Sequence, residues 1–401
     1  MNDRVATLSP SQHMAATATR IPAMVFVRDR DSEGVIRQSL SDLGIANSEF
    51  VSGGIDAAIT TLAQRPSPRL LVTDVTGVHD PVARINALAE VCEPGVGVVV
   101  IGESNDIRLY RSLKEAGVVE YFFKPLVGIL LTRTFHSVIT GGPEQRGTRT
   151  GKLVFVLGIR GGDGATTIAA NTAWHLAENG QRQALLLDLD LQFGDAALQL
   201  DVTPSHALRE ALEHPERVDE LFLQRGVTHV TERLGLLAAQ ESLSESINLN
   251  DEAVLSLLGN LLHRYRYVVV DIPTVLAPRL IRVLTLPSIL LLVSTASLAS
   301  ARDVARWRQQ IGPNTPERIT LHVLNKNGSH TSLPLAEFTR AVGQPPDVII
   351  PYEREIGLAS NLGVAAVRKC VSLQRGLTPL YRHLTGEAVQ VPQSFLRRLF
   401  G

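Results

Sequence analysis

The sequence is poor in cysteine and has no excess of charge of either sign. Only two cysteines, Cys92 and Cys370, occur in 401 residues. They lie far apart without the spacing of metal ligands, which excludes a disulfide framework and a cysteine-based zinc site and fits a reducing cytosol. The 39 basic and 40 acidic residues give a formal net charge of −1. This balance gives no general reason to expect nucleic acid or an anionic membrane as a partner.

Long apolar runs are also missing. The longest uncharged run, residues 284–300, contains Pro287 and several hydroxyl groups, and its apolar centre is too short to cross a bilayer. We expect a buried parallel strand there instead. Residues 1–20 are polar and lack the apolar core of a signal peptide, so we expect a disordered N-terminal segment.

Two blocks of alternating strand-like and helix-like segments fill most of the chain. Residues 21–140 hold five apolar segments separated by amphipathic stretches: AMVFV, SEFVS, LLVTDV, VGVVVIG and VEYFF. Residues 141–150 are polar and glycine-rich, as in a linker, and residues 151–386 continue the alternation before a tail at 387–401. This pattern predicts an α/β fold in two domains. We expect a five-stranded, flavodoxin-like parallel sheet in the first domain and a mostly parallel sheet flanked by helices in the second.

The segment RGGDGATT, residues 160–167, lies between a strand-like and a helix-like run. Its glycines allow the backbone to point several N–H groups at one spot, and a helix that begins near Ala165 adds its positive end, so the loop can hold phosphate. The hydroxyl groups of Thr166 and Thr167 suit a magnesium ion and a phosphate oxygen. A ligand-free turn is the alternative for the loop taken alone, because Ala165 replaces the usual lysine. The candidate cofactor-binding residues of the loop are Gly161, Gly162, Asp163, Gly164, Ala165, Thr166 and Thr167.

Aspartates end two strand-like segments of the second block. Asp188 and Asp190 close LLLDLD, and Asp271 follows the apolar residues of YVVVDI. An aspartate at such a strand end holds magnesium in P-loop folds, although each one alone is equally a turn former. The order of glycine loop, DxD strand and aspartate-ended strand is far more specific. It predicts a Mg²⁺ site formed by Thr166, Asp188 and Asp271.

In this order the segments resemble the deviant Walker A ATPases of the ParA/MinD type, whose loop reads roughly KGGxGKT[TS]. The resemblance covers about residues 151–370, including HVLNKN and IPYEREIGLASNLG, and implies that Asn325 bonds the adenine with Pro351 beside it. Over its whole length the chain resembles the TadZ/CpaE group, which helps place and assemble Tad (Flp) pili. Members of that group carry a receiver-like domain, GATT-like loops without the lysine and DLDLQFGD-like strands.

Two departures from the ParA/MinD pattern bear on activity. The family's signature lysine, which reaches the partner's phosphates across a dimer, is Arg160 here, and arginine keeps the charge and a planar fork. The lysine that neutralises the β- and γ-phosphates is Ala165. Its loss costs on the order of 1.5–3 kcal/mol, or roughly ten- to a hundredfold in affinity. We therefore expect ATP and Mg²⁺ binding with weak or absent hydrolysis, with Asp190 and Arg160 as the catalytic candidates.

The first block resembles a response-regulator receiver domain. Asp74 stands where the family has its phospho-acceptor and Lys124 where it has its lysine. Arg28, however, takes the place of the first metal-binding acid, which leaves Asp29, and Gly102 takes the place of a Thr or Ser hydroxyl. Phosphorylation needs the metal that this set would bind weakly. We expect a pseudo-receiver that serves as a docking surface, with a plain turn-forming role as the alternative for Asp74.

Other conspicuous residues have simpler interpretations. His175, His263 and His322 lack ligand spacing, and Trp174 is expected in the core. The basic excess in residues 352–401 is explained as well by solvated helix faces as by contact with DNA. SFLRRLF within it is short for stable membrane binding, and a partner-docking or domain-packing segment is expected there.

Three functions compete on the sequence. The first is an ATP-binding homodimeric scaffold for the pilus assembly machinery, the second an active ParA/MinD-type ATPase that cycles on DNA or membrane, and the third a phosphorylation-controlled response regulator. Ala165 disfavours the second, and Arg28 with Gly102 disfavours the third. The expected location is the cytoplasm, with recruitment to a cell pole or to the inner face of the inner membrane.

Overall fold

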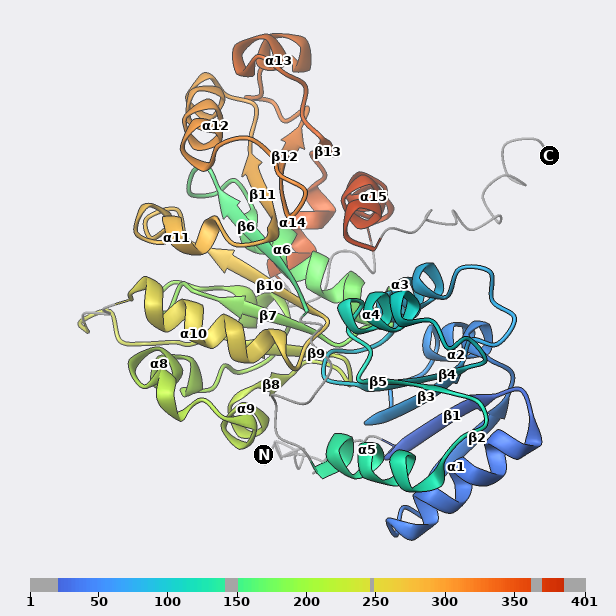
Figure 1. Ribbon diagram of the computed structural model, residues 1–401. Helices are drawn as coiled ribbons and strands as arrows, with labels where there is room; N and C mark the ends of the chain where they lie inside the picture. Colours follow the sequence, from blue (N-terminus) through green and yellow to red (C-terminus); the bar gives the residue numbers. More distant parts are fainter. Residues whose placement is uncertain (1–20, 141–150, 246–248, 362–369, 386–401) are drawn as a thin grey trace, which may run out of the picture.

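The computed structural model describes residues 21–140, 151–245, 249–361 and 370–385 as two α/β units (Figure 1). The expectations for the N-terminal segment, the linker and the tail lie outside the described residues. None of the described helices is long and apolar enough to cross a membrane.

The first unit is a five-stranded parallel sheet with helices on both faces. The strands are β1 Ala23–Val27, β2 Ser48–Ser52, β3 Leu70–Asp74, β4 Gly97–Gly102 and β5 Glu120–Phe123. The helices are α1 Arg30–Asp42, α2 Ile55–Leu62, α3 Pro81–Val91, α4 Ile107–Glu115 and α5 Gly128–Thr140. The strand order β2-β1-β3-β4-β5 is that of doubly wound, flavodoxin-like sheets. The five expected strands are confirmed.

The second unit is an eight-stranded sheet in the order β13-β12-β11-β6-β10-β7-β9-β8. Its strands are β6 Lys152–Gly158, β7 Ala184–Asp188, β8 Thr228–His229, β9 Leu234–Leu237, β10 Tyr267–Ile272, β11 Ser288–Ser294, β12 Arg318–Asn327 and β13 Val348–Pro351. Its helices are α6 Ala165–Trp174, α7 Ala196–Gln199, α8 Ala207–Glu213, α9 Glu220–Gly226, α10 Asp251–Leu262, α11 Ile281–Leu284, α12 Leu298–Ile311, α13 Leu335–Val342, α14 Arg354–Asn361 and α15 Val371–Thr385. The sheet is parallel except for the short β8, which pairs antiparallel with β9 and which the sequence patterns did not predict.

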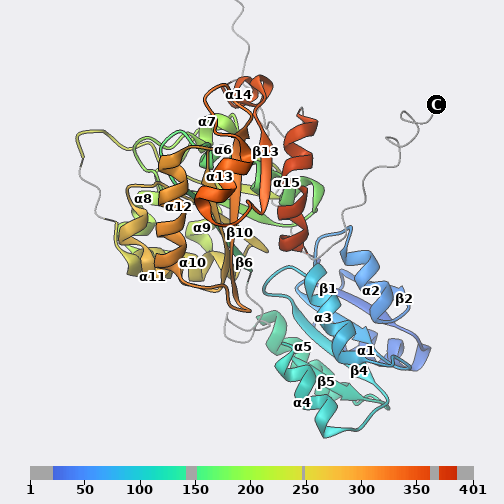
Figure 2. The same ribbon diagram turned by 90° about the horizontal axis from the view of Figure 1, so that it is seen from above.

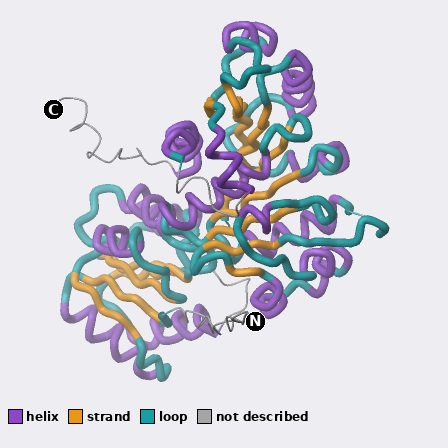
Figure 3. Tube along the Cα trace, turned by 180° about the vertical axis from the view of Figure 1, so that it is seen from behind, coloured by secondary structure: helices purple, strands orange, loops and turns teal. Residues whose placement is uncertain are grey.

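Apolar side chains fill both faces of this second sheet. One core joins the strands to α8, α10, α11 and α12, and the other joins them to α6 and α15. These two groups of helices lie on opposite sides of the sheet, as Figure 1 and, from behind, Figure 3 show. The middle of the long uncharged run, Ser288–Ser294, forms β11 between β12 and β6, and the ends of the run belong to α11 and α12. This middle part is a buried parallel strand, as expected, because strands covered on both faces are apolar throughout.

Polar contacts join the two units at the edge of the second sheet where its strands begin. Glu90 of α3 pairs with Lys152 (2.9 Å) and with Arg266 (2.7 Å), which lie at the starts of β6 and β10. The Arg182 guanidinium donates to the carbonyl oxygens that end α2 and α3, at 3.3 and 3.2 Å. Figure 2 shows the first unit beside the second in this arrangement. The first unit therefore lies at the edge opposite to that where the strands end.

The histidines without ligand spacing belong to the core or the surface, as expected. His175 stacks on Tyr381 with the ring centroids 3.4 Å apart, and burial lowers its pKa to about 4. His322 shares a 2.8 Å hydrogen bond with Ser294, and burial lowers its pKa to about 4 as well. His263 is exposed.

Trp174 and the two cysteines lie in or against the apolar cores. Trp174 is half-buried and packs against the core, and Cys92 and Cys370 are both buried and unbridged. In the part of the chain that the structure describes, no group of three or more His, Cys, Asp or Glu residues is arranged to hold a metal ion by itself.

Candidate phosphate-binding and metal site

The glycine-rich loop between β6 and α6 adopts the backbone shape that an anion-binding loop needs. Gly162 has φ of +82° and Gly164 has φ of +88°, a region that residues with a side chain rarely occupy. A Cβ on Gly164 would lie 2.5 Å from the Asn325 amide nitrogen. Glycine is thus required at position 164 both for backbone conformation and for space.

The helix that follows presents its N-terminus to the loop. Helix α6 begins at Ala165, as the sequence predicted, and its N-cap Gly164 has no side chain with which to cap it. The first N–H groups of a helix have no partner inside it, and the helix dipole makes this end positive. Thr166 and Thr167 lie in this first turn. The loop and the helix start together can bind a phosphate group.

Asp163 holds the loop in this shape through its side chain, a role that the sequence did not reveal. One of its carboxylate oxygens accepts from the backbone N–H of Arg160 at 2.8 Å, and the other accepts from the Thr295 hydroxyl at 2.9 Å. Its carbonyl oxygen accepts from the Asn325 amide at 2.9 Å. The carboxyl is buried, which raises its pKa. These contacts show that the loop is preformed.

The two predicted metal-binding aspartates meet at the end of the sheet. Asp188 and Asp271 are direct neighbours in the pairing of β7 with β10, and Thr166 lies near enough to Asp271 to favour its charged form. Burial, together with the other acidic groups nearby, raises the pKa of Asp188 to about 7. Burial and the neighbouring Asp188 raise the pKa of Asp271 well above its ordinary value. Buried carboxylates this close are stabilised by a cation.

A magnesium ion fits this donor set. Two carboxylates and one hydroxyl group are oxygen ligands of the kind that Mg²⁺ takes together with substrate phosphates. Bound there, the ion would help to neutralise phosphate charge. The predicted set of Thr166, Asp188 and Asp271 is therefore assembled in one place, although its use for metal stays a prediction.

Asp190 lies next to this set and is half-buried. Its backbone N–H donates to the Asp188 carboxylate at 3.0 Å, and its own carboxylate accepts from the N–H of Phe193 at 2.9 Å. A Cβ on Gly194 would lie 2.5 Å from the Asp188 carboxylate, so this turn also needs glycine. The role of Asp190 as a catalytic candidate stays a prediction.

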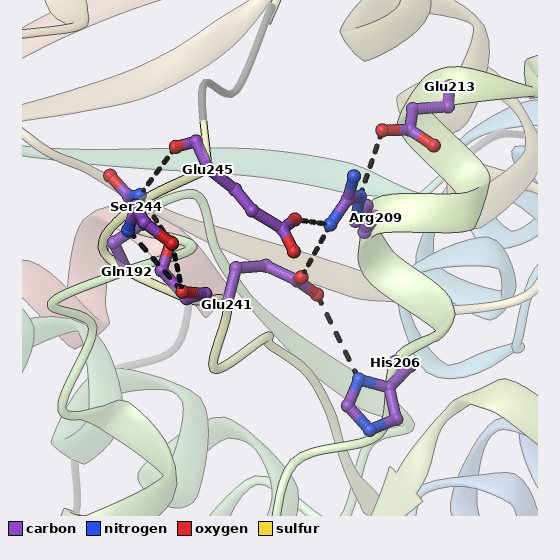
Figure 4. A network of polar contacts seen from close by, with 8 residues as sticks. Gln192, His206, Arg209, Glu213, Glu241, Ser244 and Glu245 are labelled. Atoms are coloured by element: carbon purple, nitrogen blue, oxygen red, sulfur yellow. Dashed lines mark hydrogen bonds and ion pairs between the residues drawn. The ribbon is translucent and has the colours of Figure 1, made fainter.

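A polar network fixes the loop that continues from Asp190 (Figure 4). The Gln192 amide donates to the carbonyl oxygens of Ser242 and Glu245, each at 2.9 Å. Arg209 of α8 forms ion pairs with Glu245 and, at 2.9 Å, with Glu241. The network joins the loop after β7 to the loop after β9.

The residues expected around the adenine lie on two neighbouring strands. Asn325 is buried on β12 beneath the loop, where its amide is engaged by the Asp163 carbonyl. Pro351 is the exposed last residue of β13 and pairs in register with Asn327. The structure thus brings Asn325 to the loop and places Pro351 on the adjacent strand. Their contact with a base stays a prediction.

Two cationic side chains meet the loop from outside. The Arg160 side chain is 43 % exposed and pairs with Asp303 of α12 at 2.8 Å. The Lys326 ammonium donates to the Gly162 carbonyl oxygen at 2.7 Å. The sequence did not predict a role for Lys326, whose one signal is its place directly after Asn325 in HVLNKN.

In the first unit, an ion-pair cluster closes the site around Asp74. Lys124 donates to Asp29 at 2.6 Å and to Asp74 at 2.7 Å, and the Asp74 side chain is 0 % exposed. The other oxygens of these two carboxylates accept from the backbone N–H groups of Ser32 and Thr76. All four carboxylate oxygens therefore already have donors, which leaves no evident metal site.

The structure also explains the glycine at position 102. A Cβ there would lie 2.8 Å from the Tyr121 hydroxyl group, which donates to the Ser104 carbonyl oxygen at 2.7 Å. Tyr121 thus occupies the space that a Thr or Ser side chain at Gly102 would need. This finding supports the pseudo-receiver interpretation.

We expect that small phosphodonors cannot label Asp74. Acetyl phosphate with Mg²⁺ should leave the intact mass of the protein unchanged, because the acceptor is buried and its oxygens are engaged. Asp74→Asn is the control for labelling elsewhere. Stoichiometric labelling of the wild type that Asp74→Asn abolishes would restore the phosphorylation-controlled hypothesis.

Comparison with known proteins agrees with this geometry in the second unit. Residues 152–311 match the family model described as cellulose biosynthesis protein BcsQ. The septum site-determining protein MinD of Helicobacter pylori is 24% identical over 262 residues, covering 62% of this chain and 96% of that protein.

Solved structures that resemble parts of the chain include a ParA family ATPase of Chlorobium tepidum and a pilus assembly protein CpaE of Caulobacter crescentus. The first is 23% identical, with a TM-score of 0.49, over 57% of this chain and 96% of that chain. The second is 30% identical, with a TM-score of 0.28, over 30% of this chain and 93% of that chain. In sequence, the second unit is thus similar to MinD and to the BcsQ family model.

Proposed function

We propose that this chain is an ATP-binding scaffold of the TadZ/CpaE kind, which helps to place the assembly machinery of a Tad (Flp) pilus. In this proposal ATP and Mg²⁺ bind at the loop, two subunits associate around the nucleotide, and hydrolysis is weak or absent. The observation that carries the proposal is the preformed loop above Asp188 and Asp271, in which Ala165 stands where a lysine is expected.

Different residues would bind the phosphates and the metal ion. The N–H groups of the loop and of the first turn of α6 would hold the phosphates, and Thr166, Asp188 and Asp271 would hold the metal. Without a lysine at position 165, charge that develops on the γ-phosphate is poorly neutralised, and phosphoryl transfer depends on that neutralisation. Slow turnover would make the ATP-bound state long-lived, which suits a positional scaffold.

Exposed apolar side chains support an interface at the edge of the sheet where the loop lies. Large apolar residues are strongly exposed in the segments that follow β7, β10 and β11: Phe193 (73%), Leu198 (72%), Val275 (82%) and Leu298 (70%). A soluble protein tends to cover such residues where they gather. A two-fold dimer that meets through this edge would cover them.

The first unit has a second group of exposed apolar side chains. They lie at the end of β5 and at the starts of α4 and α5: Ile107, Phe123, Val127, Ile129 and Leu130. We assign this face to docking of pilus assembly proteins. A cytoplasmic location and recruitment to a pole or membrane remain predictions.

The dimer is tested by the mass in solution with and without Mg²⁺-ATP. The wild type should become dimeric with ATP, and Arg160→Ala should remain monomeric because a guanidinium in a dry interface can bind two phosphate oxygens. Breaking the intramolecular ion pair of Arg160 with Asp303 costs only about 0–1 kcal/mol, as for other exposed ion pairs. Arg302→Ala is the matched control, since Arg302 pairs with the same Asp303. A wild type that stays monomeric at saturating ATP would contradict the dimer.

A further inference from the structure

Lys326 is held at the phosphate loop in an uncommon conformation. Its φ is +53°, which few residues other than glycine adopt. Its backbone N–H donates to the Asn325 side chain at 2.9 Å, and its carbonyl oxygen accepts from the N–H of Ser329 at 3.2 Å. These contacts direct the side chain towards the loop, where the ammonium group donates to the Gly162 carbonyl oxygen at 2.7 Å.

Among the residues that the structure describes, the Lys326 ammonium group has no acid in direct contact and forms no salt bridge. It donates to the neutral Gly162 carbonyl oxygen instead. Burial raises the pKa of Asp163, and Lys326 is near enough to oppose that rise, but both Asp163 carboxylate oxygens already accept from other donors. The ammonium group is therefore available for an anion at the loop.

The loop itself lacks a positive side chain from its own helix, because α6 begins with Ala165. Lys326 reaches the same loop from β12, across the mouth of the site. We propose that Lys326 supplies the phosphate-binding cation that position 165 lacks. The ammonium group would exchange the Gly162 carbonyl for a phosphate oxygen when an anion enters, because a charge-assisted hydrogen bond is the stronger one.

This inference rests on the proposed ATP site, and it makes a distinct prediction. Lys326→Gln should weaken binding of Mg²⁺-ATP by about ten- to a hundredfold, as expected for one lost charge-assisted bond. Lys326→Arg should retain most of the affinity, and the affinity of Lys326→Gln should depend less on salt than that of the wild type. The matched control is Lys114→Gln, because Lys114 also donates to a backbone carbonyl but lies in the first unit.

A double variant separates a phosphate contact from a latch that only shapes the loop. If Lys326 replaces the missing lysine, adding Ala165→Lys to Lys326→Gln should restore the affinity for ATP. The increase in affinity that Ala165→Lys causes should be larger in Lys326→Gln than in the wild type. If Lys326 acts as a latch, which only shapes the loop, the double variant should bind ATP as weakly as Lys326→Gln does. Affinities can be measured by titration with a fluorescent ATP analogue, with thermal melting to confirm folding.

Each outcome bears on a defined claim. Wild type that binds no ATP overturns the proposed function and this inference with it. Wild type that binds ATP while Lys326→Gln binds equally well overturns the inference alone. Weakened binding that Ala165→Lys fails to restore also overturns it, in favour of the latch.

Discussion

Replacing Gly164 with valine should abolish binding of Mg²⁺-ATP. A β-branched residue at φ of +88° is strained, and its Cβ would lie 2.5 Å from the Asn325 amide that holds the Asp163 carbonyl. The loop would lose the shape that points its N–H groups at one spot. We expect an affinity at least about a hundredfold lower, since several phosphate contacts are lost together. Titration with a fluorescent ATP analogue measures the change.

Gly343→Val is the matched control for this variant. Gly343 has φ of +89° at the end of α13, and a Cβ there would meet no atom within 4 Å. The control therefore carries similar backbone strain away from the loop, and it should bind ATP as the wild type does. Wild-type affinity in Gly164→Val would show that the loop is not the phosphate site.

Ala165→Lys should raise the affinity for ATP by about tenfold or more, because one charge-assisted hydrogen bond to phosphate is gained. Position 165 is the first residue of α6 and is half-buried beside the loop, so a long side chain can reach the phosphates. Phosphate release should also rise, since charge on the γ-phosphate is better neutralised. Equilibrium titration and a phosphate-release assay check both effects.

Ala165→Met separates charge from length in this experiment. It adds a long side chain without an ammonium group, and it should gain neither affinity nor turnover. If Ala165→Lys behaves like Ala165→Met, the phosphates do not lie where the resemblance to ParA/MinD-type proteins places them.

The sequence predicted those parts of the site that depend on local pattern. The strand–loop–helix order placed the start of α6 at Ala165, and apolar runs that end in aspartate placed Asp188 and Asp271 at strand ends. Parallel pairing of β7 with β10 then brings these two carboxylates together. The period of the apolar residues predicts such strands and helices because each of them must bury one face in the core.

The sequence could not predict contacts between segments that are far apart in the chain. The bond of Thr295 to Asp163, the reach of Lys326 to Gly162 and the closure of position 102 by Tyr121 each join different loops or strands. The pairing of Glu90 with Arg266 between the two units is of the same kind. Such contacts depend on how the elements pack, and a pattern within one segment carries no record of that packing. The short β8 was not predicted because its two residues are too few to show the alternation of a strand.

The most direct test of an ATP-binding scaffold is the fate of bound ATP in the full-length protein. Nucleotide-free protein is mixed with Mg²⁺ and labelled ATP, freed of unbound nucleotide, and followed for retained ATP and released phosphate. We expect about one intact ATP per chain, retained with little phosphate release. No retained nucleotide would contradict ATP binding, and rapid release of phosphate would contradict the scaffold in favour of a cycling ATPase.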